Sequence, residues 1–449
     1  MPTNITPYVP PSVITKNLTN LNGSDLYVAP NVIAIVARID HYPVRSTSRV
    51  LGNGSTAVIN DANVIAGTVT LKDYSGVTLI QDEDYTIAID DEQNTFSVTV
   101  INDQIKTQSI LISYQYLPDN FFDPLIWNTK ANVESYYGIA YNDDGTVASP
   151  ITAAARMAFD NGGVAVGVVP VYDKDTSGPD ANPTQDLETA LEKLKMRDDI
   201  ALVVPVGFDE NELDLFRQHI LWCCEHRHER RGIFALDGTA QTYTVEDLCD
   251  IARSIDYEQI MFIANNVAPV YVADSRTTVD LPGWLIAAAA AGVAMAYPVY
   301  RSLTRLTLTG FQGVQKFLYD EKCTLAQAGC SVIEMVNGQI RFMHSVTTRQ
   351  SMMLDWSYAG VYNYIAQSIR YYLDVYIGLP SNDTILTEIK ATCDLFLTNQ
   401  VETGYIYSYD DLEVSRRNGN PEIVDVSFRY AWQRPLLWII VSLTVDLSY

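Results

Sequence analysis

Two kinds of hydrophobic pattern divide the chain. Continuous apolar runs alternate with amphipathic segments of helical period through most of the sequence, and a different, strictly alternating pattern interrupts them early on. The continuous runs that we interpret as buried strands are residues 32–37, 164–171, 200–206, 233–236 and 260–264. Strands that are apolar on both faces and alternate with helices are typical of a parallel sheet covered on both sides. The pattern therefore predicts an α/β core with a mixed, mostly parallel sheet and helices on both faces.

Helical segments between these runs carry start and stop signals. The expected helices are residues 151–159, 184–195, 213–224, 281–298, 358–375 and 385–400, a further helix from Thr244, and a short one with Val314, Phe317 and Leu318 on one face. The cationic segment 226–231 followed by Gly232 is expected to end the helix of residues 213–224, because cations complement the helix dipole there. Asn337-Gly338 predicts a hairpin turn.

The early alternating pattern covers residues 41–124. Strands of period two are expected at residues 64–71, 77–80, 84–89, 96–101 and 110–116, separated by turn residues at short intervals. This spacing predicts a small all-β sandwich inserted after the first core strand. The acidic runs 82–84 and 90–92 lack the spacing of a calcium loop, so we interpret them as solvated turns.

The two ends of the chain differ from its middle. Residues 1–24 are rich in proline, threonine and asparagine and contain too little apolar surface to fold alone, which predicts an extended N-terminal arm. Residues 422–430 alternate cleanly, and residues 436–447 are apolar, so two C-terminal strands are expected. Strands at a chain end need a sheet to join.

Composition excludes several classes of protein. The 449 residues carry a formal net charge of −24, which argues against direct nucleic-acid binding because phosphate recognition needs a basic surface. The six cysteines form no CxxC motif, so reduced thiols in a cytosolic fold are expected. The N-terminus does not have the pattern of a signal peptide. Residues 281–300 approach membrane-spanning length but are mostly alanine with Pro and Gly, which predicts a core helix and no membrane insertion.

Candidate chemistry is sparse. Gly162 and Gly163 follow a helix instead of opening one, which is the wrong order for a phosphate-binding loop. The Cys223/His226 spacing lacks the second ligand pair of a structural zinc site. Asp237 follows a strand where α/β enzymes hold catalytic groups, but no nucleophile motif accompanies it. We therefore assign no catalytic, cofactor or metal residue, and an α/β hydrolase using Asp237 stays the rival interpretation.

The order of elements after residue 320 carries a resemblance. A helix, Leu325-Ala326-Gln327-Ala328-Gly329, a strand, the Asn337-Gly338 turn, a strand ending at Thr347-Thr348, and Asp355-Trp356-Ser357-Tyr358 opening a long helix follow one another. This series resembles the C-terminal core of contractile tail sheath proteins of bacteriophages and related injection systems. The resemblance covers most of the chain, is strongest from about residue 132 to residue 449, and weakens in the β insert.

The resemblance implies a domain plan and a function. It implies an N-terminal arm (residues 1–24), a core (25–40 and 125–415), an inserted β domain (41–124) and C-terminal strands and arm (416–449). It implies a virion subunit, assembled in the host cytoplasm, that polymerises with itself as hexameric rings and contacts the tail tube, baseplate and tail terminator proteins. Strands exchanged between subunits are expected at Tyr8, Val9, Val13, Ile14, Ile423, Val424, Val426 and Phe428. Another tail component, such as a baseplate or tube protein, is the alternative within this class.

Overall fold

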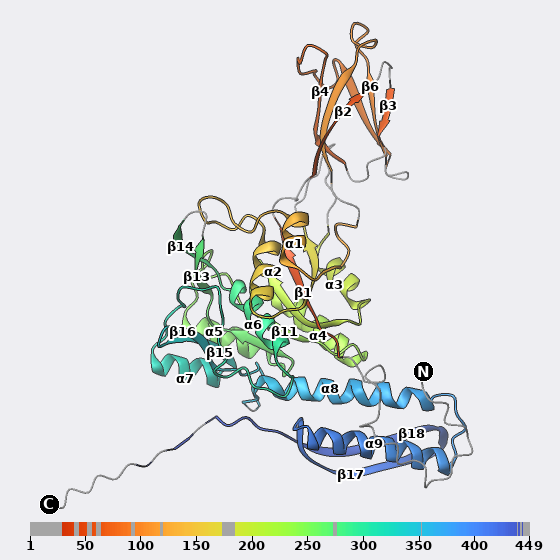
Figure 1. The fold of residues 1–449 in the computed structure, drawn as a ribbon, viewed down its shortest axis with the longest axis vertical. Coiled ribbons are helices and arrows are strands. Elements are labelled where there is room, and N and C mark those ends of the chain that lie inside the picture. Colours follow the sequence, from red (N-terminus) through yellow and green to blue (C-terminus); the bar gives the residue numbers. More distant parts are fainter. Residues whose placement is uncertain are drawn as a thin grey trace, which may run out of the picture.

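Three regions follow one another in space in the computed structural model (Figure 1). The structure describes residues 29–39, 45–51, 56–59, 64–90, 95–116, 120–172, 185–272, 276–351, 353–437, 439–440 and 442. A small all-β unit lies at one end, an α/β body in the middle, and a layer of two long helices and a hairpin at the other end. The predicted N-terminal strand residues Tyr8, Val9, Val13 and Ile14 lie outside the described residues.

A single eight-stranded sheet runs through the α/β body. In spatial order its strands are β16 (Gln339–His344), β15 (Cys330–Val336), β12 (Ile260–Ile263), β11 (Arg231–Phe234), β10 (Ile200–Val206), β1 (Val32–Arg38), β9 (Ala165–Val171) and β8 (Leu125–Trp127). Neighbouring strands from β15 to β9 are parallel, whereas β16 and β8 pair antiparallel at the two edges. The predicted mixed, mostly parallel sheet is confirmed.

Helices cover both faces of this sheet. The helices of the body are α1 (Lys130–Tyr137), α2 (Pro150–Asp160), α3 (Leu187–Lys195), α4 (Leu213–Glu225), α5 (Val245–Ile255), α6 (Trp284–Ala296) and α7 (Tyr319–Gln327). Along β1, Ile33 and Ile35 pack with α2 and α6, whereas Val32 and Val36 belong to a second core that includes α3, α4 and α5. Because successive residues of a strand point to opposite faces, a strand buried on both faces has to be apolar throughout.

The Ala-rich helix α6 packs closely against α2. A Cβ atom on Gly292 would come within 2.2 Å of the Ala158 carbonyl oxygen, so no larger residue fits there. Gly162, just after α2, has a φ of +105° and would place a Cβ 2.6 Å from Ala296. Both glycines serve helix ending and helix packing, in agreement with the prediction that they are not part of a phosphate loop.

The cationic segment after α4 was predicted wrongly. The helix ends at Glu225, and Gly232 lies within β11, where a Cβ would meet Ile220 and Phe234 at 2.6 Å. Arg230 and Arg231 are buried. Arg230 donates to the carbonyl oxygens of Leu194 (3.1 Å) and Arg197 (2.7 Å). Two of the cations that the sequence assigned to the helix dipole, Arg230 and Arg231, therefore belong to the interior of the body, whereas His226 and Arg227 are exposed.

Near β15 and β16 the predicted hairpin turn is confirmed, whereas the predicted short helix around Val314 is wrong. Asn337 and Gly338 both have positive φ angles, 52° and 79°, as the hairpin turn between β15 and β16 requires. The expected short helix around Val314 is absent: helix α7 begins only at Tyr319, and Val314 is buried in the core of the α6 side. A separate two-stranded hairpin, β13 (Val267–Val272) and β14 (Thr277–Pro282), leads into α6.

The all-β unit consists of two three-stranded antiparallel sheets. One contains β2 (Arg45–Leu51), β7 (Ile110–Tyr116) and β4 (Val64–Lys72), and the other β3 (Thr56–Ile59), β6 (Thr95–Val100) and β5 (Tyr85–Asp90). Buried residues of both sheets, such as Leu71 and Ile112 of one and Val98 of the other, form a single cluster. The predicted strand at residues 77–80 is instead a loop with one isolated bridge from Thr78 to Lys72.

The last region begins with α8 (Trp356–Leu373), which docks on the body. The Trp356 ring is buried under the Arg231 guanidinium, whose carbon lies 4.2 Å from the ring centroid. Asn363 and Gln259 exchange two side-chain hydrogen bonds of 3.0 Å. A short 3₁₀ turn, η4 (Asp374–Tyr376), leads to α9 (Asp383–Glu402), and the strands β17 (Ile406–Arg417) and β18 (Asn420–Trp432) follow.

Candidate assembly surface

The two final strands form a long hairpin that rests on α9. β17 and β18 pair antiparallel from Ile406–Trp432 to Arg417–Asn420, and Gly419 in the turn has a φ of +82°. One face of the hairpin packs against the helices. Its apolar side chains are Leu412, Val414, Val424, Val426, Phe428, Tyr430 and Trp432, in contact with residues of α8, η4 and α9. Among the residues that the structure describes, the hairpin therefore contacts the helices through one face only.

The other face of the hairpin is polar. It carries Arg417, which donates to Asp425 at 2.5 Å, and Arg429, which pairs with Asp411. The hydrogen bond from Arg417, together with its positive charge, lowers the pKa of Asp425 below its ordinary value. Of the four predicted C-terminal exchange residues, all half-buried, Val424, Val426 and Phe428 belong to the apolar face, whereas Ile423 lies outside both apolar clusters.

Both long edges of this hairpin are without a neighbouring strand among the described residues, because β17 and β18 form a sheet by themselves. The two edges differ in regularity. Register shifts between Ile406 and Ser408 and between Asp410 and Glu413 place extra residues in β17, and Asp411 has a φ of +55°. A third shift, between Arg416 and Arg417, places extra residues in β18 next to the turn. Bulges disturb strand pairing, so the part of β18 from Val424 to Trp432 offers the more regular edge for another strand.

The chain beyond β18 is apolar and exposed. Leu436 and Ile439 are largely exposed, and Ile440 is 91% exposed. The described residues 436, 437, 439, 440 and 442 form no strand, and the remainder of the second predicted C-terminal strand, residues 436–447, lies outside the described residues. The preceding strand that pairs with β18 is β17, which the sequence prediction missed. In Figure 1 the segment runs away from the rest of the molecule.

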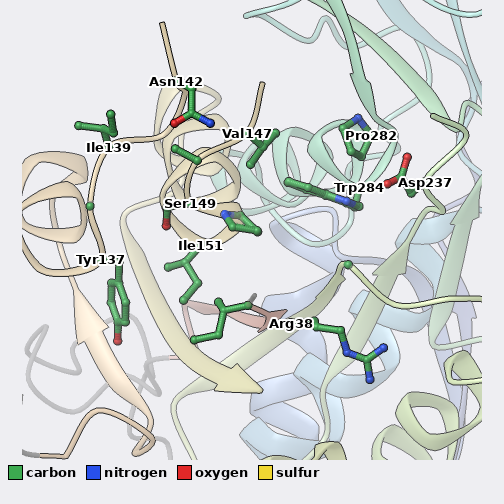
Figure 2. A pocket seen from close by; sticks show the side chains of 15 residues that line it. Arg38, Tyr137, Ile139, Asn142, Val147, Ser149, Ile151, Asp237, Pro282 and Trp284 are labelled. Carbon is green, nitrogen blue, oxygen red and sulfur yellow. The ribbon is translucent and has the colours of Figure 1, made fainter. Parts of the chain in front are cut away.

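A pocket lies at the carboxyl ends of β1, β10 and β11, where α/β enzymes hold their active sites. Its volume is about 620 Å³, and Figure 2 shows Arg38 and Asp237 on one side and Tyr137 and Ile139 on the other. Arg38 donates to Glu212 at 2.7 Å and 3.2 Å. The Asp237 carboxylate accepts from the Thr239 amide (2.8 Å) and hydroxyl (2.6 Å).

The polar groups of this pocket are therefore used to hold the local backbone. The Ser149 hydroxyl accepts from the Thr152 amide at 3.3 Å as the N-cap of α2. Asp237 forms a turn with the two residues after it, and Arg38 is held by an ion pair. The lining residues provide no nucleophile with a base at hydrogen-bond distance, which a hydrolase using Asp237 would need.

The cysteine and histidine residues near the end of α4 are arranged for packing. His219 is buried, accepts from Arg230 at 3.3 Å, and lies 3.7 Å from the Cys223 sulfur. Burial, together with the Arg230 cation, lowers the pKa of His219 to about 3, and burial raises the pKa of Cys223 to about 11. Within the described ranges no three His, Cys, Asp or Glu side chains are grouped as metal ligands. Among the same residues, no helix has the length and apolarity to cross a bilayer.

The fold of the chain is similar to that of subunits in two contractile sheaths. It matches a chain of the anti-feeding prophage helical sheath in its contracted state with a TM-score of 0.55 and 15% identity, over 72% of this chain and 89% of that one. It matches the sheath complex of an extracellular contractile injection system, PVC, also contracted, with a TM-score of 0.55 and 15% identity, over 72% and 87%.

A curated relative extends the similarity to nearly the whole sequence. The chain is 26% identical over 446 residues to the tail sheath protein of Mycobacterium phage Bxz1, covering 97% of this chain and 75% of that protein. No family model matches the chain. The resemblance to contractile tail sheath proteins expected from the sequence is confirmed by this relative and by the fold.

Proposed function

We propose that this chain is a structural subunit of a contractile phage tail sheath. Subunits polymerise as stacked hexameric rings around a tail tube, and contraction of the stack drives the tube through the host envelope. The observation that carries the proposal is the β17–β18 hairpin, whose strands have 12 and 13 residues and whose outer edges have no strand partner among the described residues. An exposed edge of this length is a template for a strand from another chain.

Strand exchange between subunits completes this hairpin. Val424, Val426 and Phe428 anchor β18 to the helical layer, so its edge is held in place as an acceptor. The donors are the N-terminal arm, through Tyr8, Val9, Val13 and Ile14, and the exposed apolar segment after Trp432. Each backbone hydrogen bond of an added strand contributes about 1 kcal/mol net, so several of them make a joint that survives reorientation of the bodies.

The work of contraction comes from contacts between bodies and requires no nucleotide. A lattice changes state when the contacts of one arrangement are better than those of the other. A gain of a few kcal/mol per subunit, summed over the whole sheath, is sufficient. The β unit of residues 45–116 is an inserted domain that lies outside this mechanical core, and the ends of the chain act as arms.

The partners follow from this role. The subunit binds other copies of itself, the tail tube, and the baseplate and terminator proteins at the two ends of the tail. It is assembled in the host cytoplasm, becomes part of the virion, acts during genome ejection and has no enzymatic activity. A baseplate role is the second candidate, because a chain of the anti-feeding prophage baseplate shares this fold with a TM-score of 0.56 at 15% identity.

Truncation of the N-terminal arm tests the proposal. A chain lacking residues 1–16 is expected to fold and stay soluble but to form no sheaths, because the donor strand is lost and the described core is untouched. Negative-stain electron microscopy measures polymer length, and thermal unfolding of the truncated chain against wild type serves as the folding control. Full-length sheaths made by the truncated chain would exclude the arm as a donor.

A further inference from the structure

The far end of the inserted β unit exposes an apolar loop. β4 runs from Val64, paired with Tyr116 near the body, to Lys72 at the opposite end, so the loop after Lys72 lies at the tip. In this loop Tyr74 is 87% exposed, and Val77 and Ile80 are each more than half exposed. We call residues 73–84 the tip loop. Exposed apolar residues grouped at one place are typical of a contact surface.

The tip loop is also rigid and acidic. Asp73 accepts from the Val77 amide at 2.8 Å, and Asp84 accepts from the Ile80 amide at 2.9 Å and from Asn102 at 2.7 Å. These bonds fix the apolar side chains between two turns. Asp82 and Glu83 stay exposed on the same loop. A partner surface for the tip loop therefore needs apolar groups and a positive charge.

A surface of this kind exists on the body of the same chain. Leu318 and Tyr319, at the start of α7, are 73% and 79% exposed. Lys322 follows them one helical turn later on the same side, and Lys316 is exposed just before them. We call these residues, with Arg305 and Arg341, the α7 face.

The charges of the α7 face are not balanced locally. Glu334, with a side chain 11% exposed, forms ion pairs with Arg305 at 2.6 Å, Lys322 at 3.1 Å and Arg341 at 3.4 Å. Two further acids lie in the first turn of α7: Glu321 accepts from the Leu318 amide at 2.6 Å, and Asp320 is exposed. With Lys316 included, four cations face three carboxylates, in a chain whose net charge is −24. The face can accept further negative charge.

We propose that the tip loop of one copy docks on the α7 face of another copy. Tyr74, Val77 and Ile80 pack on Leu318 and Tyr319, while Asp82 and Glu83 approach Arg305 and Lys322. Contact between two tip loops is disfavoured because like carboxylates would face each other. Since the two surfaces differ, the contact is heterologous and propagates in an open array, as a helical sheath requires. The inference rests on the proposed function and adds a second link between copies, separate from strand exchange.

Charge reversal tests the contact. Glu83→Lys on the tip loop and Arg305→Glu on the α7 face each place like charges opposite one another. At low ionic strength each single variant is expected to raise the protein concentration needed for polymerisation roughly tenfold. The chain with both reversals is expected to return to within about threefold of wild type, because the charges again oppose each other. Sedimentation of polymer from subunit measures this concentration for the full-length chain.

Controls separate this contact from folding and from net charge. Asp143→Lys makes the same change of charge as Glu83→Lys, but on an exposed loop of the body. This variant is expected to polymerise as wild type does. Thermal unfolding of each variant confirms that it is folded. Single reversals that polymerise like Asp143→Lys, or a double reversal that shows no recovery, overturn the tip contact alone. A folded wild type that forms no polymer overturns the proposed function instead.

Discussion

The central sheet and the C-terminal hairpin differ in how far the rest of the chain covers their strands. Every residue of β9 is buried, and helices cover both faces of the sheet around it. In the hairpin only Ile406 is buried, one face is polar, and no strand covers either long edge in the described part of the chain. The difference teaches that the central sheet is covered within one chain, whereas the hairpin keeps open edges in the described part of the chain, as the proposed strand exchange requires.

Matched tryptophan truncations give the largest expected contrast between the two regions. Trp356→Ala removes a ring buried at the docking of α8 and uncovers the Arg231 guanidinium, so we expect a loss of about 3–5 kcal/mol in the free energy of unfolding. Trp432→Ala removes a half-buried ring at the edge of the hairpin, where it contacts Tyr358, and is expected to cost about 1–2 kcal/mol. Urea unfolding measures both. Equal losses would mean that the hairpin is as integral to one chain as the body.

Lowering the pH is expected to destabilise the body through protonation of His219 in the unfolded chain. Because the pKa of His219 is lowered to about 3 from an ordinary value of 6.5, the unfolded chain binds a proton between these values that the folded chain does not bind. The contribution of neutral His219 to the free energy of unfolding is fully present above about pH 6.5. It falls by about 1.4 kcal/mol per pH unit as the pH drops from about 6.5 toward about 3.

The variant His219→Gln keeps an acceptor for Arg230 and removes the titration. Its stability at neutral pH is expected to be lower than that of wild type, but the difference should shrink on acidification. Urea unfolding of both proteins at about pH 7 and about pH 5 measures this convergence. Parallel loss of stability in the two proteins would exclude His219 as the responsible group.

The sequence predicted the body well because its strands are apolar on both faces, a pattern that turns and surface segments do not share. β17 was missed because the bulge at Asp410-Asp411 breaks the alternation of apolar and polar residues that identified β18. Arg230 and Arg231 could not be placed from their helix-end position, because the carbonyl groups and the ring that receive them come from distant segments. The open edges of the hairpin could not be predicted, because the pattern of apolar and polar residues along a strand does not show which strands pair with it.

Amide hydrogen exchange of the hairpin tests the central claim most directly. In the unassembled subunit, outward-facing amides of β18 are expected to exchange fast, and in assembled sheaths the same amides should become strongly protected as a strand from another copy pairs with them. The amides of β1, already buried within one chain, should change little and serve as the internal reference. If sheaths form while exchange along both edges of the hairpin stays as fast as in the free subunit, the hairpin is not the joint between subunits.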